Sequence, residues 1–182
     1  MPVEVLAAVG DAARHPPLAD PSEATDPTSA PAWWPGIGPV ADELVSTLPA
    51  ALRLGQLRAD PSVRPWLVRG IIAPDPTNAS GRAVIGHIGG HGAPGADGSV
   101  EIGYTVAEPW RRRGVATEAA LAWFAWAHHQ GARRARLSTT DDNAASLAIA
   151  GHLGLEPIGR VWDDHDQVWE AVFEADLPLH PT

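Results

Sequence analysis

The sequence contains no cysteine among its 182 residues. This excludes disulfide bonds, a thiol nucleophile and thiolate-bound metal sites. The sequence also lacks any apolar run near the ~20 residues that a membrane-spanning helix needs. Its first residues carry no basic leader typical of a secretory signal. We therefore expect a soluble, cytoplasmic protein with no membrane partner.

Positive charge is scarce as well: 13 basic residues stand against 22 acidic ones, giving a net charge of −9. Phosphate contacts need clustered bases, so we expect no nucleic-acid partner. The acidity is strongest from residue 156 onward, where seven acidic residues accompany one arginine. Such a surface mildly favours a cationic acceptor or partner, although solubility alone also explains most of these charges.

Length and an apolar content of 45% fit one domain with a proper core, spanning residues 1–182. Residues 1–39 are rich in proline, and they predict an extended arm with one short strand at 3–8. The arm also holds Trp33 and Trp34, a pair that is costly to leave in water. These two residues line an acceptor pocket or fill the core, and the core is the favoured reading. The core of the domain is expected to cover the remaining residues.

Periodicity in that core predicts alternating elements. In chain order they are two short helices over 40–58 interrupted by Pro49, strands at 64–73, 82–90 and 99–107, a buried helix over 115–130, a strand within 132–140, a helix capped by Asp142 or Asn143 and ended by Gly154, and a hairpin around 163–166. The first three strands have connections too short for helices, so we expect them to be antiparallel. The order as a whole predicts an α/β fold with a mixed sheet.

A strand, a loop with three arginines and a glycine, and then a helix make an anion site on physical grounds. The segment is "EPWRRRGVATEAA", residues 108–120. The first N–H groups of a helix lack internal partners, and the helix dipole adds positive charge there. Gly114 lets an anion approach the main chain, and arginine side chains add charge and donors. This arrangement favours a diphosphate over a single carboxylate.

The stretches "VEIGYTVAEPWRRRGVATEAA" and "STTDDNAASLAIAGHLGL" resemble the GNAT superfamily of acyl-CoA-dependent N-acetyltransferases. More narrowly, they resemble the branch that contains the ribosomal-protein N-terminal acetyltransferases (RimJ/RimL-like). Arg111-x-x-Gly114-x-Ala116 fits the loop that holds the CoA pyrophosphate in this family. The resemblance covers about residues 82–176 and implies the GNAT fold. That fold has about six or seven strands, with a central splayed parallel pair flanked by helices.

The resemblance also implies a co-substrate, acetyl-CoA, and the residues that would bind it. The strand end would bind the pantetheine arm through its main chain, the loop would hold the pyrophosphate mostly through N–H groups, and the next helix would contact pantetheine. These residues are Tyr104, Thr105, Val106, Arg111, Arg112, Arg113, Gly114, Val115, Ala116, Thr117, Asn143 and Ser146.

Acetyl transfer to an amine needs a base for the amine and a proton for the departing thiolate. Glu101 is the candidate base, directly or through a water; a salt bridge on the strand face is the equally weighted alternative. In many family members the general acid is a tyrosine seven residues after the motif asparagine, and here that position is Ala150. Ser146 or a water is then the candidate proton donor. The only tyrosine, Tyr104, lies in a different motif.

Other polar residues have ordinary structural explanations. His87 and His91 lie close together in "GHIGGHG", but no carboxylate stands at ligand spacing, so we expect no metal site. His128, His129 and His152 are expected to cap helix ends. The "DDHD" segment at 163–166 is expected to be a solvated turn rather than a site for a cation or a substrate amine.

These observations predict an N-acetyltransferase that acts on a primary amine, either a protein N-terminus or a small molecule. A homodimer is compatible with the sequence. The alternative is a catalytically weak acyl-CoA-binding module that senses the cofactor or regulates a partner. Such a module would keep the pyrophosphate socket and lose the acid–base groups.

Overall fold

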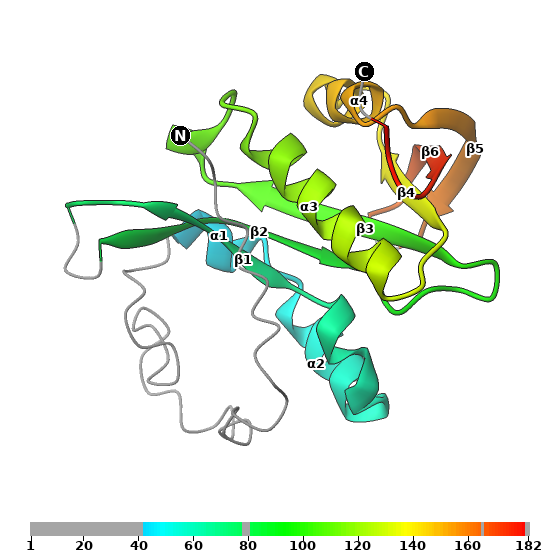
Figure 1. Cartoon of the computed structure of the whole chain (residues 1–182), viewed down its shortest axis with the longest axis horizontal. Helices are drawn as coiled ribbons and strands as arrows, with labels where there is room; N and C mark the ends of the chain where they lie inside the picture. The colour runs from blue at the N-terminus through cyan, green and yellow to red at the C-terminus, as the bar shows by residue number, and fades with distance from the viewer. Residues whose placement is uncertain (1–41, 78–80, 165, 181–182) are drawn as a thin grey trace.

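The structure is a computed structural model that describes residues 42–77, 81–164 and 166–180 (Figure 1). The expected N-terminal arm, with its strand and its tryptophan pair, lies outside the described residues. Within the described part of the chain, no helix combines the length and the apolar character that crossing a bilayer requires.

Six strands form one open sheet in the order β1-β2-β3-β4-β6-β5. They are β1 (Arg69–Pro74), β2 (Arg82–Gly90), β3 (Ser99–Val106), β4 (Arg134–Thr139), β5 (Glu156–Asp163) and β6 (Val168–Asp176). The helices are α1 (Asp42–Ser46), α2 (Ala50–Ala59), α3 (Val115–His129) and α4 (Ala144–His152), with short 3-10 helices η3 (Pro61–Trp66) and η4 (Glu108–Trp110). Only β3 and β4 run parallel. The expected mixed α/β sheet and its antiparallel first half are confirmed.

The strand expected at 64–73 is wrong at its beginning, because β1 starts only at Arg69. The preceding residues form η3, with Pro61 in its first turn and Pro65 inside it. Proline cannot donate to a strand ladder, and its fixed φ suits a tight helical turn. The side chain of Asp60 accepts a hydrogen bond from the N–H of Ser62 at 2.9 Å and so fixes the start of η3.

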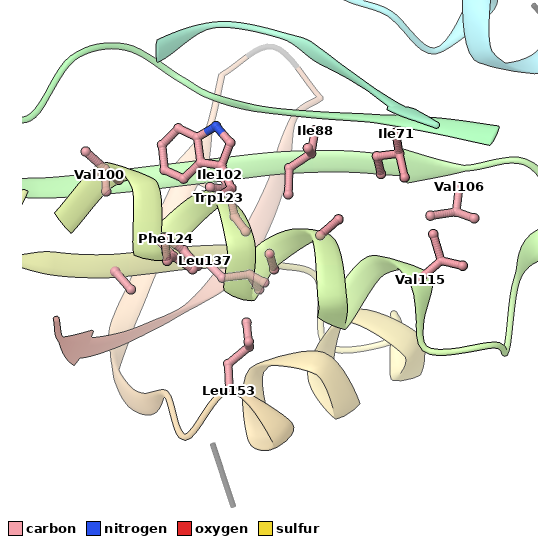
Figure 2. Close-up of a cluster of buried hydrophobic side chains, with 14 of the residues drawn as sticks. Ile71, Ile88, Val100, Ile102, Val106, Val115, Trp123, Phe124, Leu137 and Leu153 are labelled. Carbon is pink, nitrogen blue, oxygen red and sulfur yellow. The ribbon is translucent and has the colours of Figure 1, made fainter. Parts of the chain in front are cut away.

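The core lies between α3 and one face of the sheet, as Figure 2 shows. Trp123 and Phe124 of α3 are 1% and 0% exposed, and they meet alternate residues of β3 such as Val100 and Ile102. Their expected place in the core is confirmed. Truncating an aromatic side chain at such a site costs about 3–5 kcal/mol.

The helix α4 begins and ends as the sequence predicts. The side chain of Asn143 accepts a hydrogen bond from the N–H of Ser146 at 3.1 Å, which caps the first turn. At the other end Gly154 is left-handed, with φ of 71°. The N–H of Leu155 reaches back to the carbonyl of Ala150 at 3.0 Å, which completes the turn-back expected of a glycine C-cap.

The opposite face of the sheet meets α1 and α2. Thr47, which follows α1, contacts His87 of β2, and Arg53 and Gln56 of α2 donate to the carbonyl of His91. Because strand residues alternate between faces, the groups that face α1 and α2 point away from the α3 core. Helices on both faces therefore enclose β2 and β3, and this position makes β3 the centre of the candidate site.

Candidate functional site

The parallel strands β3 and β4 separate within the sheet. Their pairing covers only three positions, from Ser99 opposite Arg134 to Glu101 opposite Arg136. Beyond that point β4 still pairs with β6, and β3 still pairs with β2. The second half of β3 therefore has one edge without a strand partner. This is the expected splay of the central pair.

Along the free edge of β3, only alternate residues direct their backbone N–H and carbonyl groups toward the gap. The N–H of His91 donates to the carbonyl of Glu101, and the N–H of Ala107 donates to the carbonyl of Ile85. Backbone groups alternate in direction along a strand, so Tyr104 and Val106 direct theirs toward the gap rather than toward β2. Apart from the carbonyl of Val106, which accepts from Nε of Arg111, these backbone donors and acceptors are available to an extended ligand.

The loop between β3 and α3 ends in an open helix terminus. Gly114 is the N-cap with φ of 77°, and no side chain caps the helix. The first intrahelical bond runs from Glu118 N–H to Gly114 carbonyl at 3.0 Å. The N–H groups of Val115, Ala116 and Thr117 therefore have no partner within the helix. Together with the helix dipole they form an anion-binding terminus beside the splay.

The three arginines of the loop play different roles. Arg111 turns inward: its Nε donates to the carbonyl of Val106 at 2.8 Å, and its guanidinium pairs with the carboxylate of Glu43. Arg113 lies over the ring of Trp110 at 5.2 Å, and Arg112 adopts a left-handed φ of 59°. Arg111 therefore braces the loop against β3 and α1.

The hydroxyl of Tyr104 crosses the gap to α4. It donates a hydrogen bond of 3.0 Å to Oγ of Ser146, joining the free half of β3 to the first turn of α4. Burial raises the pKa of Tyr104, and its hydrogen bond with Ser146 offsets this only in part. The phenol is therefore protonated at neutral pH. Ala150 is 1% exposed and belongs to the core.

A cavity of about 210 Å³ opens on the other side of β3. Its lining residues are Thr47, Pro49, Arg53, Val68, His87, Gly89, His91, Gly103, Tyr104 and Thr105. Gly89 and Gly103 stand opposite each other in the β2–β3 register. Because neither glycine has a side chain, the backbone is bare between His87 on one side and His91 on the other. This leaves room for the cavity over β3.

His91 and Glu101 form a pair at the rim of this cavity. Nδ1 of His91 lies 3.7 Å from Oε1 of Glu101. A Cβ at Gly103 would lie 3.2 Å from Nε2 of the same ring, so Nε2 sits over the bare backbone. Burial lowers the pKa of His91, the carboxylate of Glu101 opposes this, and Arg53 adds to the lowering. Because the side chain keeps 52% of its surface exposed, the effect of burial is moderated by solvent.

His87 lies at the opposite wall and is fixed by Thr47. Oγ1 of Thr47 donates to the carbonyl of Glu43 at 2.9 Å and lies 3.2 Å from Nε2 of His87. Since the hydroxyl has one proton, Nε2 of His87 is the donor of the second bond. Burial lowers the pKa of His87, and Arg53 lowers it further. The cavity thus has neutral imidazoles on two walls and a guanidinium between them.

The remaining polar candidates have structural roles. Nδ1 of His152 lies 2.7 Å from the carbonyl of Ala148 in the last turn of α4, which confirms its role as a cap. Nδ1 of His128 lies 3.3 Å from the carbonyl of Ala132. Within the described residues, no group of three or more histidine or acidic side chains is placed to hold a metal ion.

Sequence reasoning missed the cavity over β3, in particular the positions of Arg53, Thr47 and the two histidines in its walls. A signal was present in "GHIGGHG". Counted with a period of two, His87 and Gly89 of β2 and His91, just after it, share one face, with the glycine between the histidines. For Arg53 and Thr47 no local signal exists, because α1 and α2 meet β2 only through the tertiary fold.

Comparison with known proteins identifies the fold and the family. The family model described as "Acetyltransferase (GNAT) domain" matches residues 19–156, more than half of the chain. No curated protein sequence matches. Among solved structures, the ribosomal-protein-S5-alanine acetyltransferase from Vibrio fischeri is 14% identical with a TM-score of 0.52, over 71% of this chain and 70% of that one.

Two further structures are similar. A domain from Methanocaldococcus jannaschii is 14% identical with a TM-score of 0.51, over 60% of this chain and 66% of that one. The microcin C7 self-immunity acetyltransferase MccE, solved with acetyl-CoA and AMP, is 18% identical with a TM-score of 0.47, over 52% of this chain and 55% of that one. The chain thus spans little more than half the length of several solved structures that it matches. At these identities the likeness is one of fold.

Proposed function

This chain belongs to the acetyltransferase (GNAT) domain family, and on that premise we propose that it transfers an acetyl group from acetyl-CoA to a primary amine. The observation that carries the proposal is the relation of two openings to one strand. The splay and the open terminus of α3 lie at one edge of β3, and the cavity lies over its face at Gly103 and Thr105. A thioester and an amine could therefore meet at the same stretch of backbone.

Acetyl-CoA, when bound, supplies the acetyl group as a thioester. In this proposal the N–H groups of Val115, Ala116 and Thr117 bind its diphosphate, since they are the unpartnered donors at the positive end of α3. The arginines of the loop add positive charge, and Arg111 holds the loop in place through Val106 and Glu43. The free edge of β3 binds the pantetheine amides, and Asn143 with Ser146 lies beside it at the start of α4.

The base in this proposal is His91 together with Glu101. Glu101 has no arginine partner within ion-pair distance in the described part of the chain, since Arg136, opposite it in register, pairs with Glu174 and Asp97. Neutral His91 takes the proton of the amine, and Glu101 stabilises the imidazolium that forms. With a pKa below its ordinary value, His91 is unprotonated and ready to accept at neutral pH.

The proton donor for the thiolate in this proposal is Tyr104, with Ser146 as its partner. As the amine nitrogen bonds to the acetyl carbon, the carbon–sulfur bond breaks, and the sulfur needs a proton or a hydrogen bond. The phenol on β3 points to α4, where many relatives place their tyrosine one turn further on, at the position of Ala150. A main-chain N–H near Val106 would stabilise the negative charge on the carbonyl oxygen.

Turnover of acetyl-CoA with a panel of primary amines, followed by release of free thiol, tests the proposal. The panel should contain peptides with free N-termini, amino acids, polyamines and amino sugars. Amine-dependent thiol release, with the acetylated product seen by mass spectrometry, is the expected result.

The alternative is a catalytically weak sensor of acyl-CoA, and the absence of a tyrosine at Ala150 favours it. Thermal unfolding with and without CoA separates the two functions. If CoA raises the melting temperature but no amine in the panel is acetylated, the sensor is correct and the enzyme proposal fails. If CoA has no effect either, both fail.

A further inference from the structure

The guanidinium of Arg53 lies in the wall of the cavity and has no carboxylate partner among the described residues. Ion pairs with a carboxylate within 4.0 Å are formed, among the described residues, by Arg111, Arg134, Arg136 and Arg160. Arg53 has none there. Its Nη1 donates to two neutral oxygens, Oε1 of Gln56 at 2.9 Å and the carbonyl of His91 at 3.4 Å.

The Nε of Arg53 is buried and has no hydrogen-bond partner among the described residues. A guanidinium stays charged at any pH the protein meets, so it cannot relieve burial by losing its proton. Leaving a buried charged donor unpaired is unfavourable. Burial lowers the pKa of Arg53, and no nearby acid opposes that effect. The cavity therefore presents a half-buried cation with no carboxylate partner among the described residues, which favours an anionic ligand.

The opposite rim of the cavity is acidic. Glu101 lies beside His91, and burial together with the carboxylates of Asp163 and Glu101 raises the pKa of Glu170. His91 stands between the two ends, since Arg53 lowers its pKa while Glu101 and Asp163 raise it. The cavity is thus polarised, with a cation at the α2 wall and carboxylates near the base.

From these contacts we infer that the acceptor is an amino-carboxylate: a small molecule whose carboxylate binds the guanidinium of Arg53 while its amine meets His91 and Glu101. The inference rests on the proposed acetyl transfer and names its substrate class. One guanidinium edge offers two parallel donors, which match the two oxygens of a planar carboxylate. The acidic C-terminal region then attracts the amine end, so the acceptor is a zwitterion rather than a polycation.

The test compares matched acceptors that differ only in their negative charge. Glycine, β-alanine and γ-aminobutyrate are each assayed beside their own carboxamides, which keep the amine and lose the carboxylate. The series also varies the distance between the two groups, so the best member reports the span from Arg53 to the base. We expect kcat/KM for the best carboxylate to exceed that of its amide by about 10- to 100-fold, carried mainly by KM.

Arg53→Gln should remove this preference, because the amide side chain keeps the helix and loses the charge. Because Arg53 also contacts the carbonyl of His91, the readout is the ratio of activity on each carboxylate to activity on its own carboxamide, measured within the same variant. Arg58→Gln is the matched control, since Arg58 is an exposed arginine on the same helix. It should leave the carboxylate preference intact.

A preference for the amides, or a carboxylate preference that survives Arg53→Gln, overturns the inference while leaving the acetyltransferase proposal standing. If no amine is acetylated, calorimetric titration with the N-acetylated amino acids and their amides decides the matter without turnover. Tighter binding of the carboxylates that depends on Arg53 supports the anion site even where the enzyme proposal fails. Equal binding of both forms overturns it.

Discussion

The hydroxyl of Tyr104 lies 3.0 Å from Oγ of Ser146 and bridges the gap that opens between β3 and β4. The two residues come from different motifs, 42 positions apart in the chain. Ala150, at the position where the sequence resemblance implies a tyrosine, has no side-chain group that can deliver a proton. The bond between Tyr104 and Ser146 places a phenol beside the same helix from the strand side. A strand residue can thus supply the group that the helix lacks.

Tyr104→Phe should lower kcat by about 10- to 100-fold, because it removes the proton donor and keeps the ring that packs against the core. Affinity for CoA should stay within about threefold, since the main chain of β3 is unchanged. Steady-state kinetics and calorimetric titration with CoA measure the two effects separately. An unchanged kcat would show that water protonates the thiolate.

Ser146→Ala provides the matched partner for this measurement. If Tyr104 and Ser146 act as one unit, the double variant should lose little more than the worse single variant, because interacting groups are not additive. Full additivity of the two losses would mean that their hydrogen bond has no part in catalysis.

Glu101→Gln should reduce turnover more at neutral than at high pH, where amines lose their proton unaided. In the wild type, the rate should fall as pH drops through the pKa of His91. That pKa lies below the ordinary 6.5, because burial disfavours the imidazolium. The acidic limb of the pH–rate profile should therefore lie below pH 6.5. Without the carboxylate, the imidazolium is less stable and the limb should move to still lower pH. A loss that is the same at every pH would argue against a base at this position.

Gly103→Ala should lower kcat/KM by about tenfold or more, because the new Cβ would lie 3.2 Å from Nε2 of His91 and push the ring off the cavity floor. Gly103 does not have a positive φ, so the substitution introduces no backbone strain. Gly55→Ala, in α2 with no atom within 4 Å of the added Cβ, is the control. It should preserve activity and stabilise the helix by about 0.5–1 kcal/mol. Equal activity of both variants would place the chemistry elsewhere.

Periodic patterns explain which parts of the fold the sequence could predict. The helix α3, the strand β2, the hairpin of β5 and β6 and the glycine end of α4 each follow from residues close together in the chain. The prediction of where β1 starts was wrong, because Pro61 and Pro65 favour η3 where the apolar residues alone would allow a strand. There a local conformational limit overrode the hydrophobic pattern.

The candidate site divides in the same way. The open terminus of α3 was predictable, since Gly114 and the helix that follows it are contiguous. The contacts of Tyr104 with Ser146 and of Arg53 with His91 were not, because they depend on strand order and on how α2 packs over the sheet. His91 was set aside for want of a carboxylate at ligand spacing. The β2–β3 register nonetheless brings Glu101 to it from across the hairpin.

The free energy of unfolding should depend on pH through His87. Burial lowers the pKa of His87 below its ordinary 6.5, so the unfolded chain binds a proton more readily than the folded one. The stability gained from the neutral ring is therefore present above about pH 6.5 and is lost as pH falls through the folded pKa. Urea unfolding at several pH values should show a shallower decline below that pH for His87→Gln than for the wild type. Parallel curves would mean that His87 titrates alike in both states.

Gly114→Ala should weaken CoA binding by about tenfold, the equivalent of one lost charge-assisted hydrogen bond. Two effects combine: φ of 77° disfavours any side chain, and the added Cβ points into open space at the anion-binding terminus. Gly131→Ala separates them, because Gly131 also has a positive φ, 96°, and also faces open space, but it follows the other end of α3. Both variants should lose about 1 kcal/mol of stability in denaturant unfolding. Only Gly114→Ala should weaken CoA binding in calorimetric titration. Equal CoA affinity in the two variants would show that the diphosphate does not bind at this helix terminus.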